Sequence, residues 1–170
     1  MTSESFATAE IISEMNDDVA RPMLDLILAF ARLDTSLSAW LVQAYGMPLE
    51  RGALFVENMD IGNKINRLKK LYDHDDDHDA VSALAKLRKE FDGKKSARNT
   101  IAHATFVGVL KSSPKTAVFS PMRAGDAHGQ LQIVCIPADH MEECLGWANN
   151  AADAVILIFS RLQGRLEQLP

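Results

Sequence analysis

The feature that most constrains the fold is a long apolar stripe with helical spacing near the N-terminus. Apolar residues recur every three or four positions from Met23 to Ala44, which predicts an amphipathic helix from about Val19 to Tyr45. Pro22 suits the first turn of this helix, and Gly46 followed by Pro48 ends it. Because a helix of this length must bury its stripe, we expect a helical bundle.

A second apolar row lies beside the stripe and consists of Leu24, Leu28 and Ala31. One stripe is enough to cover a bundle core, so the extra row predicts contact with a second subunit, most simply in a homodimer. Wider burial of a central helix is the alternative.

Three further helices are predicted, from about Asp60 to Tyr72, from Ala80 to His103, and from near Asp139 to the end. Residues 5–16 are interpreted as a short amphipathic turn or helix. Between the last two helices the periodicity changes, and a small antiparallel β insertion is predicted over about 105–136. The fold class is therefore mainly α, a bundle of about four main helices with a β insertion before the last.

The strands of the insertion are expected at Phe106–Leu110, Thr116–Phe119 and Leu131–Ile136, with a loop from Ser120 to Gly129. No repeat or second domain is evident, so residues 1–170 are expected to form a single domain.

Composition favours a soluble cytoplasmic protein. Two cysteines are too few for a disulfide framework, and neither a signal-peptide pattern nor a membrane-spanning apolar run is present. The formal charge of −5 argues against general coating of nucleic acid, although a local basic site remains compatible with it.

The helix from Asp60 to Tyr72 carries one such local concentration, formed by Lys64, Arg67, Lys69 and Lys70. A solvated helix face is the default interpretation of these cations, and a face that contacts phosphate is the alternative.

The segment Asp73–Asp79 contains five Asp and two His residues. His74 and His78 are four apart and are weak candidates for a metal site. A polar loop in which Asp77 or Asp79 caps the next helix fits the composition better. We therefore expect no resident metal and no cofactor.

The sequence Arg98-Asn99-Thr100-Ile101-Ala102-His103 concentrates polar chemistry at the end of a predicted helix. Arg98 follows Phe91 by seven residues and lies within roughly 20° of the same core-facing stripe. Asn99 and His103 are four apart and share another face. A buried arginine needs a partner or an interface pocket, so this placement favours a groove completed by a second copy.

An imidazole that titrates near neutral pH can move a proton to or from a ribose 2′-OH, and an arginine can stabilise a phosphate in the transition state. Arg98 and His103 are therefore candidate catalytic residues for metal-independent RNA cleavage, with Asn99 in support. The alternative is structural, with Arg98 and Asn99 satisfying carbonyls at a helix C-terminus and His103 as a favourable charge at that end.

The Arg98-Asn99-x-x-x-His103 motif resembles the signature of the HEPN superfamily, an arginine, four to six residues, and a histidine. The order of helices around the motif is similar as well. The resemblance implies a homodimer with a composite cleft, RNA as substrate, and a role in a toxin–antitoxin or phage-defence system, in which a toxin would have an antitoxin partner. A non-catalytic interaction or regulatory protein on the same scaffold, binding a nucleotide or a partner protein, is the alternative.

Overall fold

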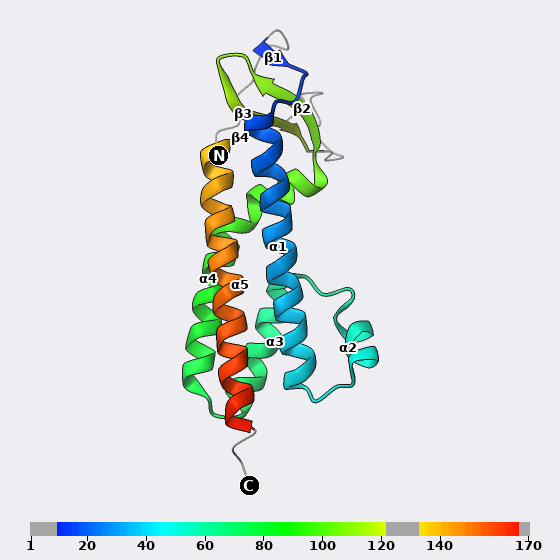
Figure 1. Cartoon of the computed structure of the whole chain (residues 1–170), viewed down its shortest axis with the longest axis vertical. Helices are drawn as coiled ribbons and strands as arrows, with labels where there is room; N and C mark the ends of the chain where they lie inside the picture. The colour runs from blue at the N-terminus through cyan, green and yellow to red at the C-terminus, as the bar shows by residue number, and fades with distance from the viewer. Residues whose placement is uncertain (1–9, 122–132, 167–170) are drawn as a thin grey trace, which may run out of the picture. The chain divides into compact units, whose positions relative to one another are not determined.

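The computed structural model describes residues 10–121 and 133–166, with side chains described as far as Ser160. This part of the chain is mainly helical and contains a small antiparallel sheet (Figure 1). The helices are α1 (Asp17–Ala44), α2 (Leu49–Val56), α3 (Ile61–His74), α4 (His78–His103) and α5 (Ala138–Leu166). The strands are β1 (Ile11–Ile12), β2 (Thr105–Leu110), β3 (Ser113–Ser120) and β4 (Val134–Pro137).

The chain divides into two compact units. Unit 1 comprises Met1–Leu28 and Lys94–Gly146, and unit 2 comprises Ala29–Gly93 and Trp147–Pro170. Helices α1, α4 and α5 contribute residues to both units. The single domain expected over 1–170 therefore stays a prediction.

Unit 1 contains the sheet, whose strands lie in the order β1-β2-β3-β4 with every neighbouring pair antiparallel. Its buried side chains include consecutive residues of β2 and β3, such as Val109, Val118 and Phe119, together with residues of the helices such as Met141. The predicted antiparallel insertion is confirmed. Residues 122–132 lie outside the described chain, and with them most of the predicted loop and the first two residues of the third predicted strand.

Strand β1 was not predicted. The sequence indicated a helix or turn over residues 5–16, and this prediction is wrong at Ile11–Ile12, which form the strand. These two residues pair with Leu110 and Val109 at the edge of β2. Gly108 makes this pairing possible, since its φ is +150° and a Cβ there would lie 2.2 Å from the carbonyl oxygen of Ile12. A two-residue strand carries too little periodicity to be recognised in sequence.

Helix α1 begins at Asp17, two residues before the predicted start, so Pro22 lies in its second turn. Two aspartates in the first turn favour this start, because they interact well with the helix dipole. Leu26 is fully buried, although the predicted stripe passed beside it. The second apolar row lies in solvent in the single chain, where Leu24 is 60% and Leu28 57% exposed.

Helix α2 brings the number of helices in the described residues to five, where about four were expected. It follows Pro48 and packs closely through Gly52, where a Cβ would lie 2.2 Å from Cγ1 of Val42. Eight residues after a Gly-x-Pro break give a weak periodic pattern, which explains why the sequence did not predict it.

The core of unit 2 contains large side chains from several helices. They include Phe30, Leu37 and Trp40 of α1 and Ile65 and Leu68 of α3. Helix α3 begins at the predicted place, because Asp60 accepts a hydrogen bond from the backbone N–H of Asn63. Helix α5 begins at Ala138, so Asp139 belongs to its first turn. None of the described helices is both long and apolar enough to cross a membrane.

Lys64 corrects one expectation from the sequence. It was assigned to a solvated basic face, yet its side chain is only 3% exposed. Its Nζ donates a hydrogen bond to Oδ1 of Asp34 at 2.7 Å. Asp34 lies thirty residues earlier, and no local pattern links the two positions. The carboxylate offsets the cost of burying the ammonium group.

Replacing Asp34 by Asn is expected to lower the free energy of unfolding by about 1–3 kcal/mol, because the Lys64 ammonium would stay buried without a counter-charge. Equilibrium urea unfolding measures this change. The matched control is Asp153→Asn, whose partner Arg32 is exposed, and it should cost less than about 1 kcal/mol. Equal losses in the two variants would contradict this account of Lys64.

Candidate functional site

The Arg98–His103 segment forms the C-terminal end of α4 and belongs to unit 1. Asn99 and His103 are exposed, and Arg98 is half-buried. The three side chains predicted from the motif are therefore held within the last turns of one helix, directly before β2.

Arg98 is only partly satisfied. Its Nη1 donates a hydrogen bond to Oδ1 of Asn99 at 3.1 Å. Its Nε is sealed from solvent and has no hydrogen-bond partner within the part of the chain that the structure describes. Buried N–H groups are rarely left in this state. A ligand from solvent cannot reach this Nε, so an external anion would contact the remaining, half-buried part of the guanidinium.

His103 is the last residue of α4 and its imidazole is exposed. Among the described residues it has no hydrogen bond or ion pair, and neither Arg98 nor Asn99 bonds a backbone carbonyl. The described contacts thus give no support to capping of carbonyls by Arg98 and Asn99, whereas His103 lies in the last turn of α4, as the structural alternative expects. Together they offer an exposed imidazole at the end of α4 and, five residues earlier on the same helix, an arginine that donates a hydrogen bond to an amide oxygen.

A second group of polar side chains in unit 1 was not anticipated from the sequence. His140 on α5 lies between Glu143, 3.3 Å from its Nδ1, and Cys144, whose Sγ lies 3.8 Å from its Nε2. Lys94 of α4 forms an ion pair with Glu143. The spacing of His140 and Cys144, four residues apart on a helix, was the available signal.

A thiol, an imidazole and a carboxylate in this order invite comparison with a nucleophilic triad. Burial argues against that function, because Cys144 is fully buried and desolvation raises the pKa of its thiol. The hydrogen bond with Lys94 lowers the pKa of Glu143, and the same contact raises the pKa of Lys94. These charges therefore stabilise each other and leave the thiol protonated and enclosed.

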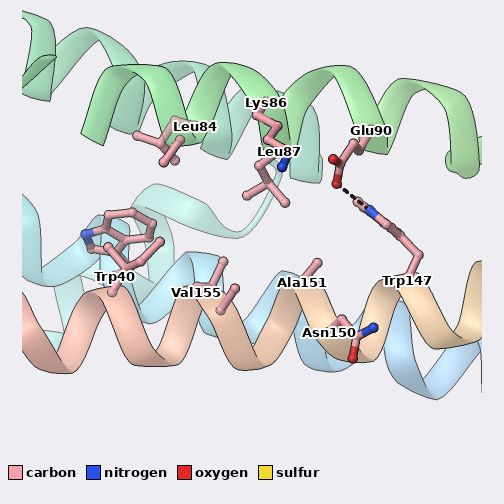
Figure 2. A pocket seen from close by; sticks show the side chains of 12 residues that line it. Trp40, Leu84, Lys86, Leu87, Glu90, Trp147, Asn150, Ala151 and Val155 are labelled. Atoms are coloured by element: carbon pink, nitrogen blue, oxygen red, sulfur yellow. Dashed lines mark hydrogen bonds between the residues drawn. The ribbon is translucent and has the colours of Figure 1, made fainter. Parts of the chain in front are cut away.

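Unit 2 contains an apolar pocket of about 270 Å³ between α4 and α5 (Figure 2). Trp40, Leu84 and Val155 contribute apolar lining, and Trp147 donates a hydrogen bond from its Nε1 to Glu90 at 3.0 Å. This pocket suits an apolar group. Its charged residues, Glu90 and Lys86, do not form a pair suited to acid–base chemistry.

The acidic run between α3 and α4 acts as a capped turn. Oδ1 of Asp77 accepts a hydrogen bond from the backbone N–H of Ala80, as predicted for a helix cap. His74 ends α3, His78 begins α4, and both side chains are exposed. In residues 10–121 and 133–160 no group of three or more acidic, His or Cys side chains is arranged to hold a metal ion.

Comparison of the chain with models of known protein families, with characterised proteins and with experimentally solved structures gave no match. What the chain does is therefore inferred from its own residues.

The thiol of Cys144 is expected to react slowly with iodoacetamide in the folded protein, since burial raises its pKa above the ordinary thiol value. Because its pKa is raised in the folded state, the protonated thiol of Cys144 favours folding. This contribution to stability is present below the pKa of the thiol in the unfolded chain and is lost as pH rises through its pKa in the folded chain. The measurement is peptide mass spectrometry of alkylation at neutral pH, in a Cys135→Ala background, with and without denaturant. Equal rates in the two conditions would contradict burial of this thiol.

Proposed function

We propose that the chain is a metal-independent endoribonuclease of the HEPN type, with Arg98 and His103 as catalytic residues. The observation that carries the proposal is the state of these two side chains. One is a half-buried arginine that has no ion pair among the described residues, and the other is an exposed imidazole five residues later on the same helix.

The chemistry follows from these groups. His103 accepts the proton of a ribose 2′-OH, and the 2′ oxygen then attacks the adjacent phosphorus. The bond from phosphorus to the 5′ oxygen breaks, which leaves a 2′,3′-cyclic phosphate and a 5′-OH. Arg98 stabilises the negative charge that grows on the phosphoryl oxygens, while Asn99 fixes the position of the guanidinium through its hydrogen bond at 3.1 Å.

A second copy of the chain completes the site in this proposal. The 5′ oxygen needs a proton as it leaves, and the His103 of another subunit can supply it when two motifs share one cleft. The exposed row formed by Leu24 and Leu28 on α1 supports a homodimer, because large apolar side chains this open favour contact with another surface. We place the activity in the cytoplasm, in a toxin–antitoxin or phage-defence system, where a toxin would have an antitoxin partner.

Arg98→Ala and His103→Ala are each expected to lower RNA cleavage by about 100-fold or more, as for loss of an electrostatic or acid–base group. The assay follows an end-labelled single-stranded RNA in the presence of EDTA and identifies the cyclic phosphate. The control His78→Ala removes an exposed imidazole at the other end of α4 and should keep full activity.

Two outcomes would overturn the ribonuclease mechanism. The first is cleavage that persists in both variants and disappears with EDTA. The second is an inactive wild-type protein whose melting temperature falls when His103 is replaced by Ala. An exposed imidazole without described contacts should contribute little to stability. A fall in melting temperature would therefore indicate a structural contact of His103 and favour the non-catalytic interaction protein.

Leu24→Glu/Leu28→Glu is expected to convert a dimer into monomers and to remove cleavage, since charges would face the partner across the row. Analytical ultracentrifugation measures the mass. The matched control is Leu157→Glu, another exposed leucine on a long helix, which should leave the mass unchanged. A wild-type chain that stays monomeric at high concentration would refute the composite cleft.

A further inference from the structure

Helix α3 presents a polar face that the proposed chemistry does not use. Asn63, Asn66, Arg67, Lys70 and Asp73 follow one another at helical spacings of three, one, three and three residues, so they lie on one face. This face, together with Lys69 and with Tyr45, the residue that follows α1, lines a groove of about 680 Å³ within unit 2. The opposite face carries Ile65 and Leu68 into the core.

The groove is basic in an acidic chain. Three cations and one carboxylate line it, which gives a local formal charge of +2, against −5 for the whole protein. Lys69 and Lys70 have no ion pair among the described residues, whereas Lys64 on the same helix is paired with Asp34. A concentration of unpaired cations on one face attracts anions.

Arg67 is positioned by aromatic rings. Its guanidinium carbon lies 5.1 Å from the centroid of the Phe55 ring, and the Phe55 and Tyr45 rings are 5.5 Å apart. A cation held by a ring keeps its N–H donors available for a ligand. Tyr45 is 38% exposed and lines the groove, so part of its ring can be reached from outside.

We infer that this groove binds single-stranded RNA, with Arg67, Lys69 and Lys70 on the phosphates and the Tyr45 ring available for stacking a base. The line from Asn63 to Asp73 spans about 15 Å along the helix, long enough for more than one phosphate. The ring and the exposed amide of Asn66 can reach bases only when these are unpaired, which favours a single strand over a duplex. An acidic peptide would use the cations and would leave the ring and the amide unused.

The test uses a short fluorescein-labelled 2′-O-methyl oligouridine, which has no free 2′-OH and cannot be cleaved through that group. Binding is therefore measured whether or not Arg98 and His103 are catalytic. Fluorescence anisotropy over a range of salt concentrations should give a slope of log K against log salt of roughly −2 for three neutralised phosphates.

Lys69→Gln/Lys70→Gln is expected to weaken binding by about tenfold or more at low salt and to make the slope less negative by about 1.4. The matched control, Lys86→Gln/Lys89→Gln, removes two exposed lysines of α4 that lie outside the groove and should bind as the wild type does. If the double variant does not fold, Lys70→Gln alone is used, because it changes only an exposed side chain. Its expected change in slope is about half that of the double variant.

The inference is overturned if the groove variants bind the probe with unchanged affinity and slope. It is also overturned if an oligoglutamate of matched charge, or an RNA duplex, displaces the probe as well as unlabelled single-stranded RNA does. A wild-type chain that binds the probe and does not cleave RNA would count against the proposed ribonuclease alone, since the probe does not report on cleavage.

Discussion

A buried charge needs a partner, and this requirement accounts for the main features of this structure. Lys64 has a counter-charge, because Oδ1 of the partly exposed Asp34 lies 2.7 Å from its buried Nζ. Arg98 meets the requirement only in part, with an amide on one nitrogen and nothing described on another. Lys70 stays in solvent and needs no partner. The three residues thus rank from structural to ligand-binding by how far their charge is satisfied.

Periodicity explains how much of the fold was predictable. The bounds of α3 and α4 lie within about two residues of expectation, since caps and apolar spacing agree there. β1 and α2 were missed because two and eight residues give no reliable period. The pairing of Lys64 could not be predicted, because its partner lies on another helix. A sequence indicates on which face of a helix a charged residue lies, but it does not show which residue of another helix pairs with it.

The motif was predictable in position and less so in detail. Helical phase placed Arg98 towards the core, and the half-buried guanidinium agrees with that placement. The hydrogen bond from Arg98 to Asn99 joins two adjacent residues, and spacing rules do not predict contacts between neighbours on a helix. The buried state of Cys144 was likewise beyond the pattern, yet it decides that the nearby imidazole and carboxylate do not activate a nucleophile.

Within residues 10–121 and 133–166, the sheet of unit 1 has one edge at β1 and one at β4, and each has a feature that limits pairing with a further strand. On one side β1 is only two residues long, and it covers part of β2 through the space left by Gly108. On the other side β4 ends in Pro137, which has no N–H to offer a further strand. Edges built in this way resist pairing with the sheet of another molecule, so open-ended addition of strands is disfavoured.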